Sequence, residues 1–170
     1  MTLLDDGALA GDWTLDSAQS TVRLATKSFW GLTKVTGRFG NISGTGTITA
    51  DGKVTGVLTI DAASIDTANA KRDTHLRSKD FFDVDNHPEI TYTVTSVTAT
   101  GAGATLEGTL TVLGNSRPLT VPATVATAGE TVTLDATAPV NRAEFGMGFN
   151  QLGMMASDNT LTVHAVFTRA

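Results

Sequence analysis

The side chains with the most chemical potential are concentrated in residues 72–90, RDTHLRSKDFFDVDNHPEI, where charges, two histidines and adjacent phenylalanines interrupt a chain of alternating Thr, Val, Gly and Ala. Arg is the side chain best shaped to bind phosphate, so Arg72, Asp73 and His75 are candidates for binding the polar head of a ligand. The alternative, which we favour, is that these three side chains dock a connecting helix, because buried polar groups need partners.

Catalytic and metal-binding chemistry receives little support. No HxH or HxxxH spacing places two histidines on one element. The sequence has no GxSxG nucleophile elbow, no phosphate-binding glycine loop and no cysteine. We therefore expect a protein that is not an enzyme, with no catalytic residue, no metal and no cofactor. The residues considered as metal ligands are His75, His87, His164, Asp83 and Asp85.

Two apolar groups adjoin these polar candidates. Leu76, Phe81 and Phe82 offer an apolar edge that we expect in the core, although a core residue of a hollow barrel can also line its cavity. Residues 145–155, FGMGFNQLGMM, combine glycines with methionines, which adapt to irregular apolar partners. This segment is either a mobile lid over an apolar opening or an ordinary loop packed on the core. Its candidate ligand-binding residues are Phe145, Met147, Phe149, Met154 and Met155.

Arg142 is a further candidate, because it ends a predicted strand whose other face is apolar. Its guanidinium must find a carboxylate or a ligand anion. Glu144 or an acid of residues 72–85 would serve, and we favour this internal ion pair over the ligand.

The elements that must position these residues are β-strands. In residues 160–168, TLTVHAVFT, Leu161, Val163, Ala165 and Phe167 alternate with polar residues, so one face is apolar. Turn residues such as Asp51-Gly52 separate the alternating stretches. Strands of this kind close most simply into an antiparallel barrel of about eight strands, which removes exposed edges. The other alternating stretches are 12–16, 20–26, 34–40, 42–50, 54–61, 90–98, 105–112, 118–126 and 131–138.

Small residues recur at positions that the alternation directs inward. They favour an interior that the protein's own side chains do not fill, although close packing of the sheet would also use them. These residues are Gly44, Gly46, Gly56, Gly108, Ala136 and Ala138.

Residues 66–80 break the alternation and predict one short helix laid against or across the barrel. Asp66 or Asn69 can cap such a helix, and Pro88 returns the chain to an extended conformation before the next strand.

Composition limits the class of protein. A chain of 170 residues suits one domain, and we expect a tail at 1–10 followed by a barrel domain at 11–170. The net charge of −5 argues against a nucleic-acid partner. No stretch approaches the about 18 apolar residues of a membrane span. The N-terminal residues lack the pattern of a secretory signal, so we expect a cytoplasmic protein.

Four separated motifs carry a family resemblance: WTLDSAQSTVRLATKS, SIDTANAKRDTHLRSKDFFDVDNHPEITY, GTLTVLGNSRPLTVPA and VNRAEFGM. In this order, over roughly residues 12–169, they resemble the YceI family of bacterial lipocalin-like polyisoprenoid-binding proteins. The sequence differs from the family pattern at Gln19-Ser20, where His-Ser is common, and at Lys27-Ser28, where Lys-His is common.

The resemblance implies an all-β, extended antiparallel lipocalin-like barrel whose apolar interior holds an isoprenoid tail, with the polar head near the mouth. The expected function is therefore to bind and to carry or store an amphiphilic lipid, foremost a polyisoprenoid such as a polyprenyl diphosphate or a quinone precursor. The alternatives are a structural or interaction barrel filled by its own side chains, and an enzyme acting on a lipid. A homodimer is an open prediction.

Overall fold

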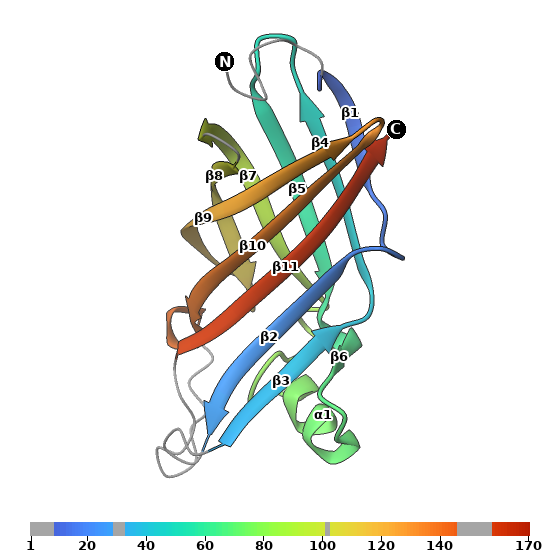
Figure 1. The fold of residues 1–170 in the computed structure, drawn as a ribbon. Coiled ribbons are helices and arrows are strands. Elements are labelled where there is room, and N and C mark those ends of the chain that lie inside the picture. The colour runs from blue at the N-terminus through green and yellow to red at the C-terminus, as the bar shows by residue number, and fades with distance from the viewer. Residues whose placement is uncertain (1–8, 29–32, 101–102, 146–157) are drawn as a thin grey trace.

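The computed structural model describes residues 9–28, 33–100, 103–145 and 158–170 (Figure 1). One antiparallel sheet contains all eleven strands of these residues. The strands are β1 Gly11–Leu15, β2 Thr21–Ser28, β3 Thr33–Phe39, β4 Ile42–Ile48, β5 Val54–Asp61, β6 Ile65–Asp66, β7 Glu89–Thr100, β8 Gly103–Val112, β9 Asn115–Ala128, β10 Thr131–Asn141 and β11 Asp158–Arg169. The helices are the 3₁₀ turns η1 Ala62–Ser64 and η2 Arg142–Phe145 and the α-helix α1 Ala70–Arg77.

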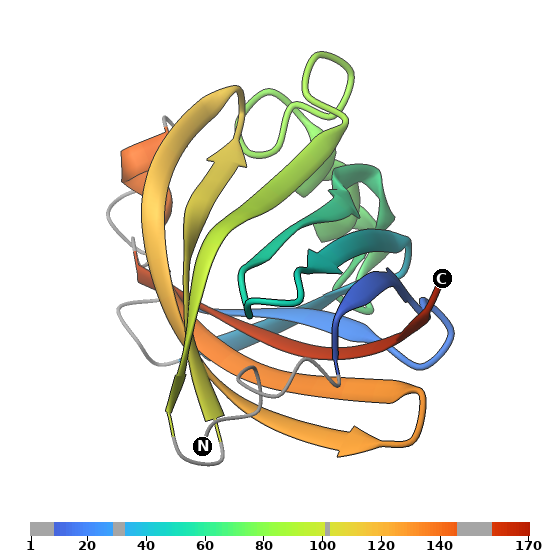
Figure 2. The same ribbon diagram turned by 90° about the horizontal axis from the view of Figure 1, so that it is seen from above.

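Eight strands close into a barrel. Their order is β1-β4-β5-β7-β8-β9-β10-β11, and the ring closes because β1 also pairs with β11. In this last pairing Trp13 lies opposite Arg169 and Leu15 lies opposite Phe167. Figure 2 shows the strands surrounding a common interior. The predicted eight-stranded antiparallel lipocalin-like barrel is confirmed.

The first strands depart from a simple meander. β11 pairs with β1 through residues 167–169 and with β2 through residues 160–164, so β2 continues along the edge that β1 begins. The Ser20 hydroxyl holds the connection between β1 and β2 against β11. It donates to the Asp16 carbonyl at 2.7 Å and accepts from the Val166 amide at 2.9 Å. β2, β3 and β6 thus extend the sheet beyond the ring towards α1 (Figure 1).

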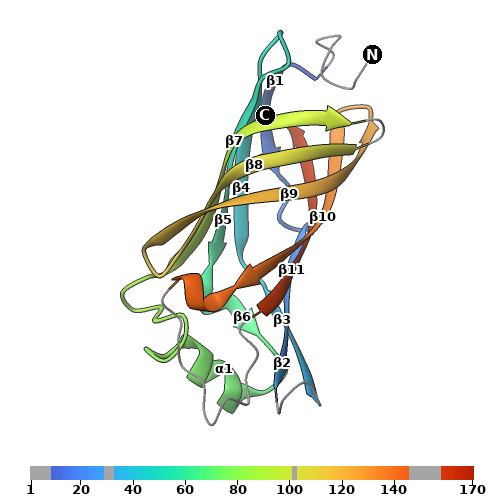
Figure 3. The same cartoon turned by 90° about the vertical axis from the view of Figure 1, so that its left-hand side faces the viewer.

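The predicted helix forms, but it is shorter than residues 66–80. Residues 65–66 pair with β3 as strand β6, so the helix begins only at Ala70. Asn69 is its N-cap, and the side-chain oxygen of Asn69 accepts from the Arg72 amide at 3.0 Å. α1 lies beyond one end of the barrel (Figure 3).

The packed core occupies the end of the barrel next to α1. Val22, Ile60 and Ile65 are its largest fully buried side chains. Phe82, which follows α1, packs edge-on against Phe39 with ring centroids 5.9 Å apart. This end of the molecule is therefore filled by the protein's own side chains. Within the described ranges, no helix has the length and apolar character needed to cross a bilayer.

Candidate ligand-binding cavity

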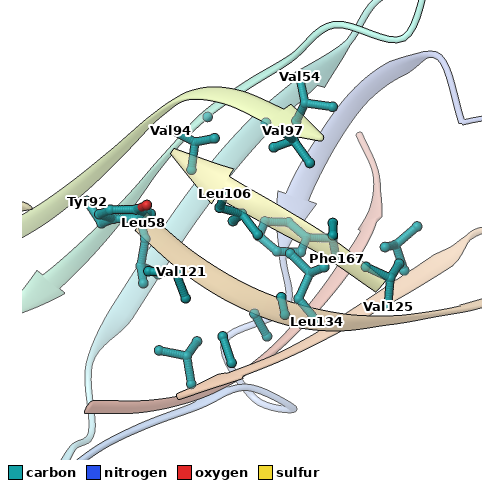
Figure 4. Close-up of a pocket in the computed structure, with 18 of the residues that line it drawn as sticks. Val54, Leu58, Tyr92, Val94, Val97, Leu106, Val121, Val125, Leu134 and Phe167 are labelled. Atoms are coloured by element: carbon teal, nitrogen blue, oxygen red, sulfur yellow. The ribbon is translucent and has the colours of Figure 1, made fainter. Parts of the chain in front are cut away.

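An apolar cavity of about 200 Å³ lies inside the barrel, and all eight ring strands contribute to its wall. Figure 4 shows aliphatic side chains pointing into it from several strands. Among the described residues of its wall none is charged. Such a surface can take up an apolar chain, because removing that chain from water is favourable without any polar contact.

The cavity exists because several inward positions carry small residues. Gly46 of β4 lies opposite Gly56 of β5, and both line the cavity, as do Ala136 and Ala138 of β10. Larger side chains at Gly46, Ala136 or Ala138 would occupy part of the space, so the prediction that small inward residues leave the interior unfilled is confirmed at these three positions. Gly56 also serves close packing, because a Cβ there would lie 2.8 Å from the Thr45 carbonyl oxygen.

Two more of the predicted inward glycines serve close packing, and these two lie outside the cavity wall. A Cβ at Gly108 would lie 2.9 Å from Cζ of Tyr92 and 2.3 Å from the Thr93 carbonyl oxygen. A Cβ at Gly44 would lie 3.2 Å from Cβ of Leu15, a core residue. Neither glycine lines the cavity, so both explanations of the small residues hold, each at different positions.

The two ends of the cavity differ. Ile60 and Leu110 line one end and belong to the core cluster that includes Phe82. At the other end the wall reaches Ile48 and Val54, which flank the β4–β5 turn away from α1. The core therefore closes the α1 side, and the cavity extends towards the opposite barrel end, where the described chain begins at Leu9 and ends at Ala170; we call this the termini end (Figure 1).

Tyr92 is the main polar side chain of the wall. Its hydroxyl donates to the Leu119 carbonyl at 2.7 Å, and its ring covers Gly108. Burial, with a smaller contribution from the charge of Glu107, raises the pKa of Tyr92 to about 12. The phenol is therefore neutral at physiological pH.

Trp13 closes part of the wall near the termini and is 4 % exposed. Its indole Nε1 donates to the Leu9 carbonyl at 2.9 Å. The Arg169 guanidinium lies over its ring, 4.6 Å from the centroid. Trp13 thus separates the apolar interior from the charged groups at this end.

The predicted polar cluster makes internal contacts at the start of α1. Arg72 donates from Nε to the Thr67 hydroxyl at 2.8 Å and from Nη2 to the Thr67 carbonyl at 2.7 Å. Asp73 is buried, and its Oδ1 accepts from the Thr67 hydroxyl at 2.5 Å and from the Thr67 amide at 2.9 Å. The two charged residues are thus linked through Thr67 rather than paired directly.

His75 is exposed and is not part of the cavity wall; its Nε2 lies 2.7 Å from Asp80, and its ring is edge-on to Phe81 with centroids 5.0 Å apart. Leu76 packs against the core, while Phe81 and Phe82 belong to it. Phe145 is also a core residue.

None of the sequence-predicted site residues that the structure describes lines the cavity, and their role in ligand binding stays a prediction. The side chain of Arg142, and all of Met147, Phe149, Met154 and Met155, lie outside the described residues. The lid and the Arg142 ion pair therefore stay predictions as well.

The residues that line the cavity are not among the predicted site residues, although some of the small ones were predicted to face an unfilled interior. Val94, Val121, Leu134 and Phe167 occupy alternate, inward positions of their strands (Figure 4). The period-two alternation already assigns such residues to the inner face. It does not separate cavity wall from packed core, because both are apolar.

Two of the three histidines, His75 and His164, pair with acids. His164 of β11 lies 2.5 Å from Asp135 of the neighbouring β10, with both side chains about half exposed. Nowhere in the described part of the chain do three metal-ligating side chains gather.

Comparison with known proteins assigns the family. Residues 13–167 match the model of the YceI-like domain. The chain belongs to the YceI-like domain family. A "UPF0312 protein" of Vibrio campbellii is 35 % identical over 129 residues, which cover 72 % of this chain and 67 % of the relative. Protein YceI of Escherichia coli is 42 % identical over 66 residues, covering 39 % of this chain and 35 % of that protein.

Solved structures of other proteins share the fold. The crystal structure of Burkholderia cenocepacia BcnA superposes with a TM-score of 0.82 at 28 % identity, covering 89 % of this chain and 98 % of BcnA. A polyisoprenoid-binding domain from Saccharophagus degradans gives a TM-score of 0.74 at 16 % identity, covering 93 % of this chain and 98 % of that domain.

Proposed function

We propose that this YceI-like protein binds and carries or stores a lipid with a long apolar chain, foremost a polyisoprenoid, inside the barrel. The observation that carries the proposal is the cavity: an aliphatic, charge-free space enclosed by eight strands. Each methylene buried there would contribute about 0.8 kcal/mol, so a chain of several isoprene units gains affinity without a polar anchor.

The family supports the same class of ligand. The Saccharophagus degradans neighbour is a polyisoprenoid-binding domain, although its 16 % identity supports likeness of fold alone. Binding requires no bond chemistry, and the cavity wall presents a tyrosine whose proton is already donated to a carbonyl rather than an acid, base or nucleophile poised for reaction.

The second candidate is a structural or interaction barrel without a lipid. It is favoured by the α1 side, where the protein's own residues fill the interior. The two candidates differ in one respect: only the first requires the space between Gly46, Gly56 and Ala136 to be occupied by another molecule.

A cavity-filling substitution tests the proposal. Ala136→Trp places an indole in the cavity and should reduce the lipid-to-protein ratio found by native mass spectrometry and lipid extraction of the purified protein. Thr137→Trp is the matched control, because Thr137 is exposed on the outer face of the same strand. It should leave the ratio unchanged.

Circular dichroism of both variants establishes that they fold. An unchanged lipid ratio in folded Ala136→Trp protein would contradict lipid binding in this cavity. A different pair of results would favour the self-filled barrel: the Ala136→Trp variant unfolds while Thr137→Trp does not, and the wild-type protein carries no lipid. Overpacking a filled interior is destabilising.

Residence in the cytoplasm and formation of a homodimer stay predictions. Cell fractionation and light scattering of the purified protein would test them separately from ligand binding.

A further inference from the structure

We propose that the lipid enters through the barrel end away from α1 and that its head group is uncharged. This inference rests on the proposed function and specifies its ligand. It excludes a polyprenyl diphosphate as the preferred ligand and favours a prenol, a quinone or a similar neutral head.

The described cavity wall has no charged side chain that could pair with a charged head group. Among the described wall residues none is ionised at neutral pH, and the proton of the Tyr92 hydroxyl is already donated to Leu119. Burying an unpaired phosphate in such a space would be strongly unfavourable. A charged head would therefore have to remain at the mouth while the tail enters.

The charges around that mouth disfavour an anion. Among the described side chains at this end three are acidic and two are basic, so their net charge is −1. The charged residues are Asp12, Asp51, Lys53, Glu130 and Arg169.

The two bases are already close to acids. Arg169 lies 2.6 Å from Glu130 through Nε, donates from Nη1 to the Ala10 carbonyl at 2.7 Å and stacks on Trp13. Lys53 is two residues from Asp51, whose pKa is lowered by the hydrogen bond that the Thr49 hydroxyl donates to it, so this carboxylate stays ionised at neutral pH. Neither base is placed to neutralise a diphosphate alone.

The undescribed segments that adjoin this end in sequence do not add a basic side chain. Residues 1–8 contain Asp5 and Asp6 but no Lys or Arg, and residues 101–102 are Gly and Ala. The excess of acids at the mouth therefore does not depend on where these residues lie.

The described arginines of α1 already have hydrogen-bond partners. Arg72 donates from Nη2 to the Thr67 carbonyl at 2.7 Å, and Arg77 donates from Nε to the Ala63 carbonyl at 2.8 Å. The core cluster around Phe82 also stands between α1 and the cavity. A tail entering the cavity thus leaves its head at the opposite mouth.

The test compares farnesol with farnesyl diphosphate, which share a tail. Trp13 lines the cavity, so its fluorescence reports filling, and Trp30→Phe removes the other tryptophan. Native mass spectrometry of the unmodified chain reports the same binding independently. We expect farnesol to bind at least about 10-fold more tightly than farnesyl diphosphate at low salt. This difference in affinity should decrease at higher salt, because salt screens the repulsion between the diphosphate and the acidic side chains at the mouth.

Tighter binding of farnesol could come from electrostatic repulsion of the diphosphate at the mouth or from the lower water solubility of farnesol. Reversing one charge at the mouth distinguishes the two explanations. Asp51→Lys should strengthen farnesyl diphosphate binding about 3- to 10-fold at low salt and leave farnesol unchanged. Glu89→Lys makes the same change of charge at the exposed start of β7, on the α1 side, and should leave both affinities unchanged.

The outcomes are distinct. If neither ligand binds, the proposed function fails. If wild-type protein prefers farnesyl diphosphate or binds both equally, the uncharged head is wrong while lipid binding stands. If Glu89→Lys shifts the diphosphate affinity as much as Asp51→Lys does, entry at the termini end is wrong.

Discussion

At the scale of single residues, Tyr92 marks the boundary between the hollow and the packed parts of the barrel. Its ring contacts the core cluster and lines the cavity, while Gly108 leaves space for it. The hydroxyl is satisfied by the Leu119 carbonyl, so a polar atom is tolerated in an apolar interior.

Tyr92 should titrate near pH 12 in the folded protein and near pH 10.0 when unfolded. Because the folded pKa lies above the unfolded value, the phenol favours the fold fully below about pH 10, and this contribution is lost as the pH rises towards 12. Tyr92 is the single tyrosine of the chain, so phenolate absorbance with and without urea measures both values. Tyr92→Phe should abolish the signal, and a native midpoint at 10 would contradict the buried hydroxyl.

Asp73 shows how the charged segment is used. Its carboxylate accepts two hydrogen bonds from Thr67, and Thr67 also binds Arg72. These contacts join the residues before α1 to its first turn, as the docking interpretation requires. They do not test a ligand role for Arg72, which stays a prediction.

At the scale of elements, α1 is a short helix held by its surroundings. Eight residues are marginal as an isolated helix. Arg77 donates to the Ala63 and Ile65 carbonyls, Asn69 caps the first turn, and Phe82 anchors the following segment in the core. The helix is therefore docked beside the packed end of the barrel.

Phe82→Ala should lower the free energy of unfolding by about 3–5 kcal/mol, because a buried ring packed against Phe39 is replaced by a cavity. Lys79→Ala, at an exposed position nearby, should change it by less than about 0.5 kcal/mol. Denaturant melts measure both. A loss below about 1 kcal/mol for Phe82→Ala would contradict its place in the core and strengthen a ligand-facing role.

At the scale of the whole molecule, the barrel is packed at one end and hollow towards the other. Core residues cluster around α1, whereas the cavity extends towards the β4–β5 turn. Local stability follows buried contacts, so the two ends should open with different free energies.

Hydrogen exchange should therefore differ along single strands. In ligand-free protein, the amides of residues 54–56 in β5 should exchange faster than those of residues 58–60, because the latter end at the fully buried Ile60. A saturating prenol should protect residues 54–56 more, since a ligand stabilises the state that binds it. Uniform exchange and uniform protection along β5 would contradict a hollow end that the lipid fills.

The sequence by itself determined the barrel, its one helix and the apolar character of the inner face, because alternation and turn chemistry are local properties. It could not determine which inward residues surround the cavity. Gly44 and Gly46 share a strand and a face, yet Gly44 packs against Leu15 and Gly46 lines the cavity. Alternation gives the face of a residue but not the residue it meets across the barrel, which depends on strand register and closure. The tertiary structure alone therefore decided where the cavity lies and that the charged segment docks at the opposite, packed end.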